Sequence, residues 1–482
     1  MRAASLRLLP LLTVAACLPA EAVLTPEVAS SPRPNLILVM TDDQGAADAG
    51  FAGSAVARTP ALDALAARGV VLETFYAAAP VCSPTRASCL TGRHPVALGI
   101  PNANTGHLPV EVPNLATLLA AEGYRTGHFG KWHLGTLTRE VRDSNRGGRT
   151  QHAHHYAPPW ERGFDTCFST EAKVPTWDPM VHPETGRPFG TRYWTGPGES
   201  VVEDLDGEDA RLIVERAQSF VDGALDEGRP FLAVLWFHGP HLPLVAPEAA
   251  TEPWAGSADA TYHAVVAGID AQVGRLWDRL ERRSAARDTL LWFCSDNGPE
   301  RAPGQDDRLS AEAYGRHPYG SAAPFRGRKR SVHEGGLRTP AFVVWPAGLP
   351  AGLRVSQPGV TTDQLPTLLS LLGLPLPEAL DGVSLAPLLR GEPWRRTQPI
   401  PFLSGRRRAL VDWPWKLVQD GGGTAGLYHL EEDPGETRDR TPEHAGLAKR
   451  MRDALARESE RLTPPSGGDR EVPGSRPPEA GR

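Results

Sequence analysis

Apolar runs of strand length recur along this chain between segments with helical periodicity. The four clearest runs span 35–40, 124–130, 231–237 and 289–294. Strands that alternate with helices favour an α/β fold, in which a mostly parallel sheet is covered by helices on both faces. We therefore predict a large α/β domain of this kind.

Polar side chains follow each apolar run at its carboxyl end. In chain order, these residues are Asp42 and Asp43, Lys131 and His133, His238 and His241, and Asp296 and Asn297. In open α/β sheets, ligands bind at the edge formed by the carboxyl ends of the strands. Four segments that are distant in sequence are therefore expected to converge on one crevice.

The connecting helices have ordinary start and stop signals. Thr59 and Pro60 begin TPALDALAARG, and Gly69 is placed to end it. Pro113 begins PNLATLLAAEG, with Gly123 at its end. Proline at the first turn and glycine just past the last turn are typical of helices that pack on a sheet.

Residues 139–200 are rich in Arg, His, Pro, Trp and Gly and have weak periodicity. This composition predicts a long excursion over the surface near the crevice. The segment contains a cluster of histidines, His152, His154 and His155. No acid or cysteine accompanies them at the spacing of a metal site, so a solvated loop is predicted.

Two further regions follow the main domain. Residues 396–463 contain short strand-like pieces and an amphipathic helix, which predict a small C-terminal α+β subdomain. Residues 464–482 are rich in Pro, Gly and charge and are predicted to form a disordered tail.

The first 22 residues have the pattern of an export signal, with Arg2 and Arg7 before the apolar stretch LLPLLTVAA. This stretch is too short for a membrane-spanning helix. The sequence VAAC resembles a bacterial lipobox, which would make Cys17 a lipidated first residue and the only membrane anchor. Cleavage after Ala22 would instead discard Cys17, and both alternatives stay open. We expect an exported protein of the bacterial periplasm or cell surface, or a secreted one.

Charge and cysteine content exclude several classes of function. The 51 basic and 57 acidic residues give a net charge of −6, which argues against a nucleic-acid partner. Five cysteines in 482 residues are too few for a disulfide scaffold. Cys294 lies inside an apolar run and is predicted to be a buried strand residue.

The acids at two of the strand ends have the chemistry of a metal site. Asp42, Asp43, Asp296 and Asn297 offer hard oxygen donors, which suit Ca²⁺ or Mg²⁺ and suit zinc poorly. An Asp-Asp pair on its own also fits a turn or a helix cap.

Cys82 opens the segment CSPTRASCLTGR, which has Pro and Arg two and four positions after the cysteine. C-x-P-x-R followed by L-T-G-R resembles the signature of type I sulfatases of the alkaline phosphatase superfamily. The resemblance covers roughly residues 33–435 and continues, in the order expected of the family, through PNLILVMTDDQG, GYRTGHFGKWHLG, PFLAVLWFHGPHLPLVAP, WFCSDNGPE, RGRKRSVHEGGLRTP and LYHLEEDPGE. It implies a sulfatase catalytic domain over 33–395, followed by the subdomain at 396–463.

The resemblance also implies roles for individual residues. Cys82 would be oxidised before folding, by a formylglycine-generating or equivalent maturation enzyme, to an aldehyde whose hydrate is the nucleophile. Asp42, Asp43, Asp296 and Asn297 would hold one Ca²⁺. Arg86 and Lys131 would stabilise the charged diol, and His133 would accept a proton from its second hydroxyl. His241 and Lys329 would bind the sulfate ester and assist the departing alcohol. His238 is not the motif histidine and is expected either to support a residue of the site from behind or to have a packing role.

These residue types also suit the reaction on physical grounds. A sulfate monoester repels an approaching nucleophile, so a dication together with Arg86, Lys131 and Lys329 would neutralise the charge that moves during transfer. A helix that begins at Cys82 would further favour an oxyanion there. Cys89, about 10 Å away on the same helix, is expected to pack in the core and not to bridge Cys82.

The sequence thus predicts hydrolysis of sulfate monoesters, on a sulfated carbohydrate. The carbohydrate prediction depends on the family resemblance and on AKVPTWDP through RYWTGPGE, where aromatic faces would stack on sugar rings. One alternative is a phosphodiesterase or phosphonate hydrolase of the same superfamily. Another is a surface lipoprotein with an inactive site that only binds sulfated glycans.

Overall fold

A computed structural model of the chain describes residues 33–300, 319–422 and 425–463. The predicted export signal with Cys17 and the predicted tail at 464–482 lie outside these residues. No helix within the described ranges is both long and apolar enough to cross a membrane.

A ten-stranded sheet organises the main domain, in the order β11-β2-β10-β9-β1-β8-β4-β5-β6-β7. Its five central strands are parallel: β9 (Thr289–Ser295), β1 (Asn35–Thr41), β8 (Phe231–Trp236), β4 (Arg125–Lys131) and β5 (Thr166–Thr170). Antiparallel pairs occur towards both edges, which hold β10 (Phe342–Val344), β2 (Val70–Leu72), β11 (Leu353–Val355), β6 (Tyr193–Gly196) and β7 (Glu199–Val201). The predicted sheet is confirmed, and its four predicted strands are β1, β4, β8 and β9.

The side chains of β1 alternate between two hydrophobic cores, as the period of a strand requires. Leu36, Leu38 and Met40 face one core, whereas Ile37 and Val39 face the other. Both faces of the sheet are therefore covered.

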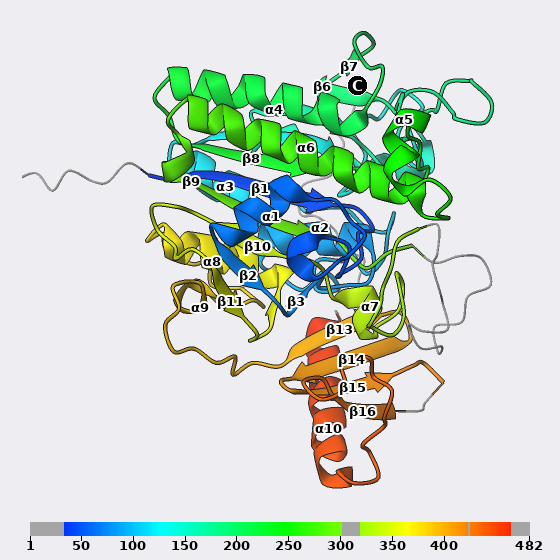
Figure 1. Cartoon of the computed structure of the whole chain (residues 1–482), viewed down its shortest axis with the longest axis vertical. Helices are drawn as coiled ribbons and strands as arrows, with labels where there is room; N and C mark the ends of the chain where they lie inside the picture. Colours follow the sequence, from blue (N-terminus) through cyan, green and yellow to red (C-terminus); the bar gives the residue numbers. More distant parts are fainter. Residues whose placement is uncertain (1–32, 301–318, 423–424, 464–482) are drawn as a thin grey trace, which may run out of the picture. The chain divides into compact units, whose positions relative to one another are not determined.

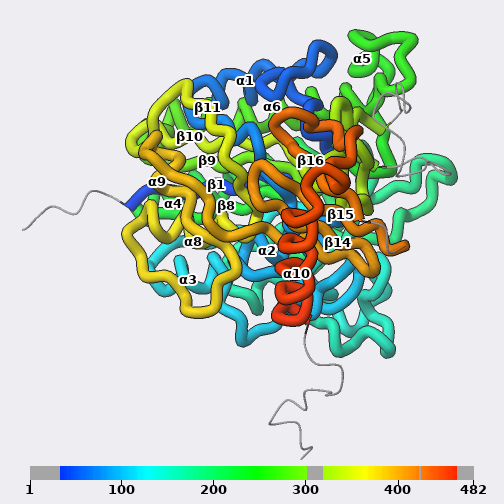
Figure 2. The backbone as a smooth tube through the Cα atoms, turned by 90° about the horizontal axis from the view of Figure 1, so that it is seen from below, coloured from blue at the N-terminus to red at the C-terminus, as the bar shows by residue number. Residues whose placement is uncertain are grey.

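Helices on the two sides of the sheet complete these cores. Helices α1 (Pro60–Ala67), α4 (Asp209–Asp226) and α6 (Ala260–Arg282) cover one face, and Figure 1 shows α4 and α6 side by side. Helices α2 (Cys82–Thr91), α3 (Leu115–Ala121), α8 (Gln364–Leu371) and α9 (Ala386–Leu389) cover the other face. In Figure 2, α1 and α6 lie towards the top of the view and α2 and α3 towards the bottom. The shorter elements are β3 (Phe75–Tyr76), β12 (Gly359–Val360), α5 (Glu248–Thr251) and α7 (Glu334–Leu337).

The predicted connecting helices are present, with one shifted start. Helix α3 begins at Leu115 and not at Pro113, because the Asn114 side chain accepts hydrogen bonds from the backbone N–H groups of Ala116 and Thr117 at 3.0 and 3.3 Å. Asn114 is thus the N-cap.

The prediction that 139–200 is a surface excursion is wrong for part of that segment. Thr166–Thr170 forms β5, which pairs with β4 inside the sheet. Its sequence, TCFST, has no apolar run, so the pattern gave no strand signal. The histidine cluster fits the prediction better, since His154 is exposed and His152 and His155 are half-buried on a 3₁₀ turn.

The predicted sugar-stacking aromatic residues are also partly wrong. Trp194 is 1% exposed, and its indole N–H donates to Asp143 Oδ2 at 2.9 Å. Tyr193 is fully buried and stacks on Phe168. Both residues belong to β6 and pack inside the protein. Trp177 and Phe189, which lie in the same stretch of the sequence, remain partly exposed.

The small C-terminal subdomain is confirmed as an antiparallel sheet with one helix. Its strands are β13 (Ile400–Ser404), β14 (Arg407–Asp412), β15 (Trp415–Gln419) and β16 (Ala425–His429), and α10 (Ala445–Leu462) follows them (Figure 1). Leu410 and Leu417 pack against α10, while Phe402 and Val418 pack against Tyr76 of the main domain.

A buried charged cluster joins this subdomain to α7. The Lys416 ammonium, on β15, lies 2.8 Å from Glu334 Oε1 and 3.1 Å from Glu436 Oε1, and all three side chains are fully buried. Glu334 Oε2 also accepts a hydrogen bond from Tyr76 at 3.0 Å. Burial alone would raise the pKa of Glu436, but Lys416 and His333 lower it to about 2.

Candidate active site

The four predicted metal ligands converge at the carboxyl edge of the sheet. Asp42 and Asp43 follow β1, and Asp296 and Asn297 follow β9, which is the parallel neighbour of β1. Asp43 N–H donates to Asp296 Oδ1 at 3.2 Å, and Asn297 Nδ2 donates to Asp43 Oδ1 at 2.6 Å. All four side chains are buried. Asp43 has a φ of 67°, and this left-handed turn ends the strand.

Two oxygens in this group point to a cation. Asp42 Oδ1 and Asn297 Oδ1 are buried and accept no hydrogen bond from the part of the chain that is described. Ligand atoms of Asp42, Asp296 and Cys82 lie within 4.8 Å of one another. Buried oxygens left without a donor are costly unless an ion satisfies them. Because carboxylate and amide oxygens are the donors that Ca²⁺ and Mg²⁺ prefer, the residues present fit such an ion.

Cys82 is the first residue of α2, as the sequence predicted, and it is 3% exposed. Burial raises the pKa of its thiol. Cys82, Cys89 and Cys294 are all free, and Cys89 and Cys294 are buried as predicted.

Arg86 lies one helical turn after Cys82 and is fully buried. Its guanidinium donates to Asp296 Oδ2 at 2.7 Å and to the Lys131 carbonyl at 3.0 Å, and it lies 5.1 Å from the ring centre of Trp236. These contacts fix the charged group between the ends of β4 and β9.

Two buried lysines approach the same acids. Lys131 contacts Asp42 directly, and Lys329 Nζ lies 2.7 Å from Asp43 Oδ2. Burial alone would lower the pKa of Lys329, but the neighbouring Asp43 carboxylate gives a net rise, so this side chain is a cation.

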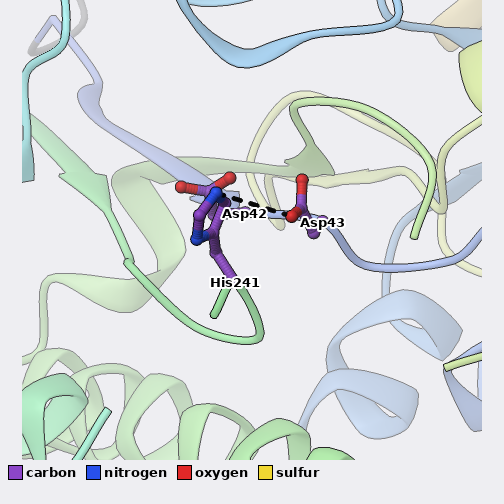
Figure 3. Close-up of side chains that lie close together, drawn as sticks. All are labelled: Asp42, Asp43 and His241. Carbon is purple, nitrogen blue, oxygen red and sulfur yellow. Dashed lines mark ion pairs between the residues drawn. The ribbon is translucent and has the colours of Figure 1, made fainter. Parts of the chain in front are cut away.

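His241 lies beside Asp42 and Asp43, as Figure 3 shows. Its Nε2 is 3.7 Å from Asp43 Oδ2, and its Nδ1 is 2.5 Å from the Leu242 carbonyl. Burial and the positive charge of Lys329 lower the pKa of His241 well below its ordinary value. The Leu242 carbonyl fixes the orientation of the ring through Nδ1 and leaves Nε2 facing the Asp43 carboxylate.

His133 follows the end of β4 with a φ of 57°. Its Nε2 lies 3.1 Å from Asn104 Oδ1, and its buried Nδ1 has no partner in the described ranges. Burial and Lys131 lower the pKa of His133 well below its usual value, so it is neutral. A neutral imidazole is able to accept a proton.

His238 is separate from this group. Its Nδ1 lies 2.8 Å from Asp209 Oδ2, and its Nε2 lies 2.7 Å from Thr170 Oγ1, in a fully buried position. These partners hold the ring inside the protein, which agrees with the predicted packing role.

The formal charges of the residues predicted for the site balance. Three carboxylates, those of Asp42, Asp43 and Asp296, face three cations, those of Arg86, Lys131 and Lys329. Burial, reinforced by Asp42, raises the pKa of Asp296 to about 7. A bound divalent cation would relieve this crowding of acids and would leave the centre positive, which suits an anionic substrate.

Sequence reasoning missed three residues around the site. Asn104 contacts His133, and Glu300 Oε2 lies 3.3 Å from Lys329 Nζ. Burial, together with the positive charges of Lys131 and Lys329, lowers the pKa of Lys173. Glu300 follows Asn297 by three positions and lies inside the motif segment WFCSDNGPE, which is a signal in the sequence. Asn104 and Lys173 lie in loops without a motif, so no signal marked them.

Two family models match the chain. A sulfatase family model matches residues 34–374, and a model for the C-terminal part of N-sulphoglucosamine sulphohydrolase matches residues 327–461. Human steryl-sulfatase is 30% identical over 443 residues, covering 77% of this chain and 72% of that protein. The N-acetylgalactosamine-6-sulfatase of Canis lupus familiaris is 32% identical over 386 residues, covering 75% of this chain and 67% of that protein.

Solved structures share the fold. The crystal structure of Ps i-CgsB in complex with k-i-k-neocarrahexaose has a TM-score of 0.74 and 28% identity, covering 89% of this chain and 93% of that one. The phosphonate monoester hydrolase of Agrobacterium radiobacter has a TM-score of 0.64 and 20% identity, with 89% and 96% covered. At that identity, the second similarity concerns the fold alone.

Proposed function

Because this chain belongs to the sulfatase family of the alkaline phosphatase superfamily, and is therefore a sulfuric ester hydrolase, we propose that it removes sulfate from a sulfated carbohydrate. The proposed nucleophile is hydrated formylglycine formed from Cys82. The proposed metal is one Ca²⁺ held by Asp42, Asp43, Asp296 and Asn297. The observation that carries the proposal is the arrangement of these buried acids and of three buried cations around residue 82.

The absent groups would supply two kinds of chemistry. Hydrated formylglycine at position 82 would supply the nucleophilic hydroxyl and a second, ionisable hydroxyl, and Ca²⁺ would supply fixed positive charge. The chain's own residues do the remaining work. Arg86 and Lys131 hold positive charge beside position 82, and Lys329 holds it on the side of Asp43. These groups are fixed before substrate arrives, so they stabilise developing negative charge without reorganisation.

Two histidines are assigned to proton transfer. His133 is the proposed base, because its ring is neutral and buried and Asn104 fixes its orientation. His241 is proposed to bind the ester next to Lys329, where it would assist the departing alcohol. The Leu242 carbonyl fixes the orientation of that ring.

Relatives support a carbohydrate substrate. One solved structure with 28% identity holds k-i-k-neocarrahexaose, and one curated relative is named for N-acetylgalactosamine 6-sulfate. Steryl-sulfatase is named for a different class of ester, so the choice has to be measured. The proposal further requires a maturation enzyme that acts on Cys82 and, given the predicted export signal, an exported protein.

Sulfate release tests the reaction. Protein co-expressed with a maturation enzyme is expected to release sulfate from an activated aryl sulfate faster than it releases the product of a matching phosphodiester. The reverse preference would favour the phosphodiesterase or phosphonate hydrolase alternative. A panel of sulfated oligosaccharides then identifies the sugar and the position of the ester.

Mass spectrometry of the peptide that contains Cys82 tests the nucleophile. Conversion of the side chain from CH₂SH to an aldehyde lowers its mass by about 18 Da. Unmodified Cys82 in protein from its native host, together with retained glycan binding, would favour the inactive binding protein. Cys82→Ala is the matched control, because it removes the nucleophile and leaves the surrounding charges in place.

A further inference from the structure

A pocket of about 610 Å³ opens beside the candidate nucleophile. Val81, which directly precedes Cys82, lines it, and so does Arg330, which directly follows Lys329. Arg330 N–H donates to the Pro80 carbonyl at 2.9 Å, so the two segments are joined at this point. The pocket lining therefore begins at the residue next to Cys82 on one segment and at the residue next to Lys329 on the other.

The C-terminal sheet provides the opposite wall. The turn from β13 to β14, residues 404–407, lines the pocket, as do Asp420 and Gly421 after β15. Arg407 Nη1 donates to the Arg330 carbonyl at 2.8 Å, which ties the turn to the main domain. A Cβ added at Gly421 would lie 3.1 Å from Arg406 Cβ, so the two turns pack closely. The pocket is thus built between two parts of the fold.

Arginine dominates the charge of this pocket. Arg330, Arg406 and Arg407 line it, against a single acid, Asp420, which is exposed and accepts a hydrogen bond from the Gly422 N–H at 2.9 Å. Arg406 is exposed and forms no ion pair within the described ranges. Because Glu300, outside the lining, pairs with Arg330, the surplus of positive charge comes from the hairpin turn, where the Arg406 guanidinium is open to a ligand.

Arg330 links the pocket electrostatically to the reaction centre. Its guanidinium pairs with Glu300, whose Oε2 lies 3.3 Å from Lys329 Nζ. The Arg330 side chain is nevertheless 47% exposed, so a ligand in the pocket reaches it. Asn102 and Ser404 line the same space and offer groups that hydrogen-bond to hydroxyls.

We propose that this pocket binds an anionic substituent, a sulfate or a carboxylate, on the sugar next to the one whose ester is cleaved. The proposal depends on the proposed function, because it places the rest of the substrate in the pocket while the reacting ester lies at residue 82. Arg406 is the main specificity-determining residue, with Arg330 and Arg407 as its supporting charges. Arginine is suited to this task, because its planar fork matches both anions.

The loop that carries Arg330 and the hairpin turn at 404–407 would thus determine which substrates bind. A carbohydrate with a charged neighbouring sugar gains a charge-assisted contact, and a neutral neighbour does not. The affinity difference expected for one such contact is about ten- to a hundredfold.

The kinetic test uses three disaccharides that carry the same cleavable sulfate. Their second sugar is neutral, sulfated or a uronic acid. Wild-type protein should show a higher kcat/KM for a disaccharide whose second sugar is charged than for the one whose second sugar is neutral. Of the two charged disaccharides, the one with the higher kcat/KM identifies the anion that the pocket binds. Arg406→Ala should lower this ratio of kcat/KM values by about tenfold or more, and Arg406→Glu should lower it further. Arg408→Ala is the matched control: Arg408 is exposed on β14, two residues after Arg406, but does not line the pocket, so the ratio should not change.

A binding measurement separates this proposal from the proposed function. Calorimetry on the Cys82→Ala protein gives the Kd of each disaccharide without turnover. Weaker binding of the charged disaccharide after Arg406→Ala, with unchanged binding after Arg408→Ala, supports the subsite even if no sulfate is released. Equal Kd values for neutral and charged partners, or equal effects of the two substitutions, overturn the subsite even if the protein is a fully active sulfatase. Matching thermal midpoints for both variants confirm that folding is retained.

Discussion

Lys416→Met is the most informative perturbation of the fold. It removes the cation from the cluster that joins the C-terminal sheet to α7. Lys416 lies 2.8 Å from Glu334 and 3.1 Å from Glu436, and each of these side chains is fully buried. Methionine has similar length and flexibility, so the substitution removes charge more than volume.

The expected cost follows from the two acids left behind. Removing one partner of a buried ion pair costs about 3–5 kcal/mol, because the remaining charge is uncompensated. Glu334 keeps Arg338, at 3.3 Å, and Tyr76, and Glu436 keeps His333, which places the expected loss towards the lower end of that range. The total stability of a folded domain is about 5–15 kcal/mol, so this loss is a large fraction of it.

Urea unfolding followed by tryptophan fluorescence measures the change. Lys416→Met should lower the midpoint strongly, and adding Glu436→Gln should recover part of the loss by removing one of the unpaired charges. Lys449→Met is the control, because Lys449 contacts Asp453 on the exposed face of α10 and should leave the midpoint unchanged. A loss below about 1 kcal/mol for Lys416→Met would refute the role given to the buried cluster.

Three further predictions concern the metal, one buried histidine and one active-site cation. Calcium at a hundred times its Kd should stabilise the protein by about 2.7 kcal/mol, which is measured as a rise in Tm. The Asp296→Asn variant should show no such rise. An equal rise in Tm for the wild-type protein and the variant would argue against the assigned calcium site. Burial lowers the pKa of His94 to about 4, against about 6.5 in the unfolded chain, so the stability it contributes is complete above pH 6.5 and is lost as the pH falls towards 4. The loss of stability from this one group totals about 3 kcal/mol. The urea midpoint of the His94→Gln variant should therefore change less between pH 7 and pH 4.5 than that of the wild-type protein. An equal change of the midpoint in both proteins would contradict this role of His94. Lys329→Met should lower kcat/KM for sulfate release by about 10²–10³-fold, and a loss of less than about tenfold would exclude Lys329 from the charge-stabilising group.

The parts of the site that the sequence predicted share one physical feature. Asp42 and Asp296 follow apolar runs whose burial on both faces makes them recognisable as parallel strands. Since parallel neighbours end at the same edge, the meeting of these acids follows from local pattern together with one rule of topology.

The parts that were missed depend on contacts with no local signature. Thr166–Thr170 is a central strand whose polar sequence is tolerated because the neighbouring strand and the loops satisfy it. Trp194 was predicted to contact sugar, although tertiary packing with Asp143 buries it. Arg330 and Arg407 are in contact because the C-terminal sheet packs against a loop of the main domain. Neither segment has a sequence pattern that predicts this contact.

The burial of Cys82 has a consequence for how active molecules arise. All ten residues of α2 are buried, and the thiol is 3% exposed. A second enzyme has no access to such a sulfur once the chain has folded, so the proposed conversion must take place on the nascent or unfolded polypeptide. Each molecule is then committed to activity or inactivity during its synthesis. The specific activity of a purified sample would be a record of the cell that made it, and no later treatment of the native protein would raise it.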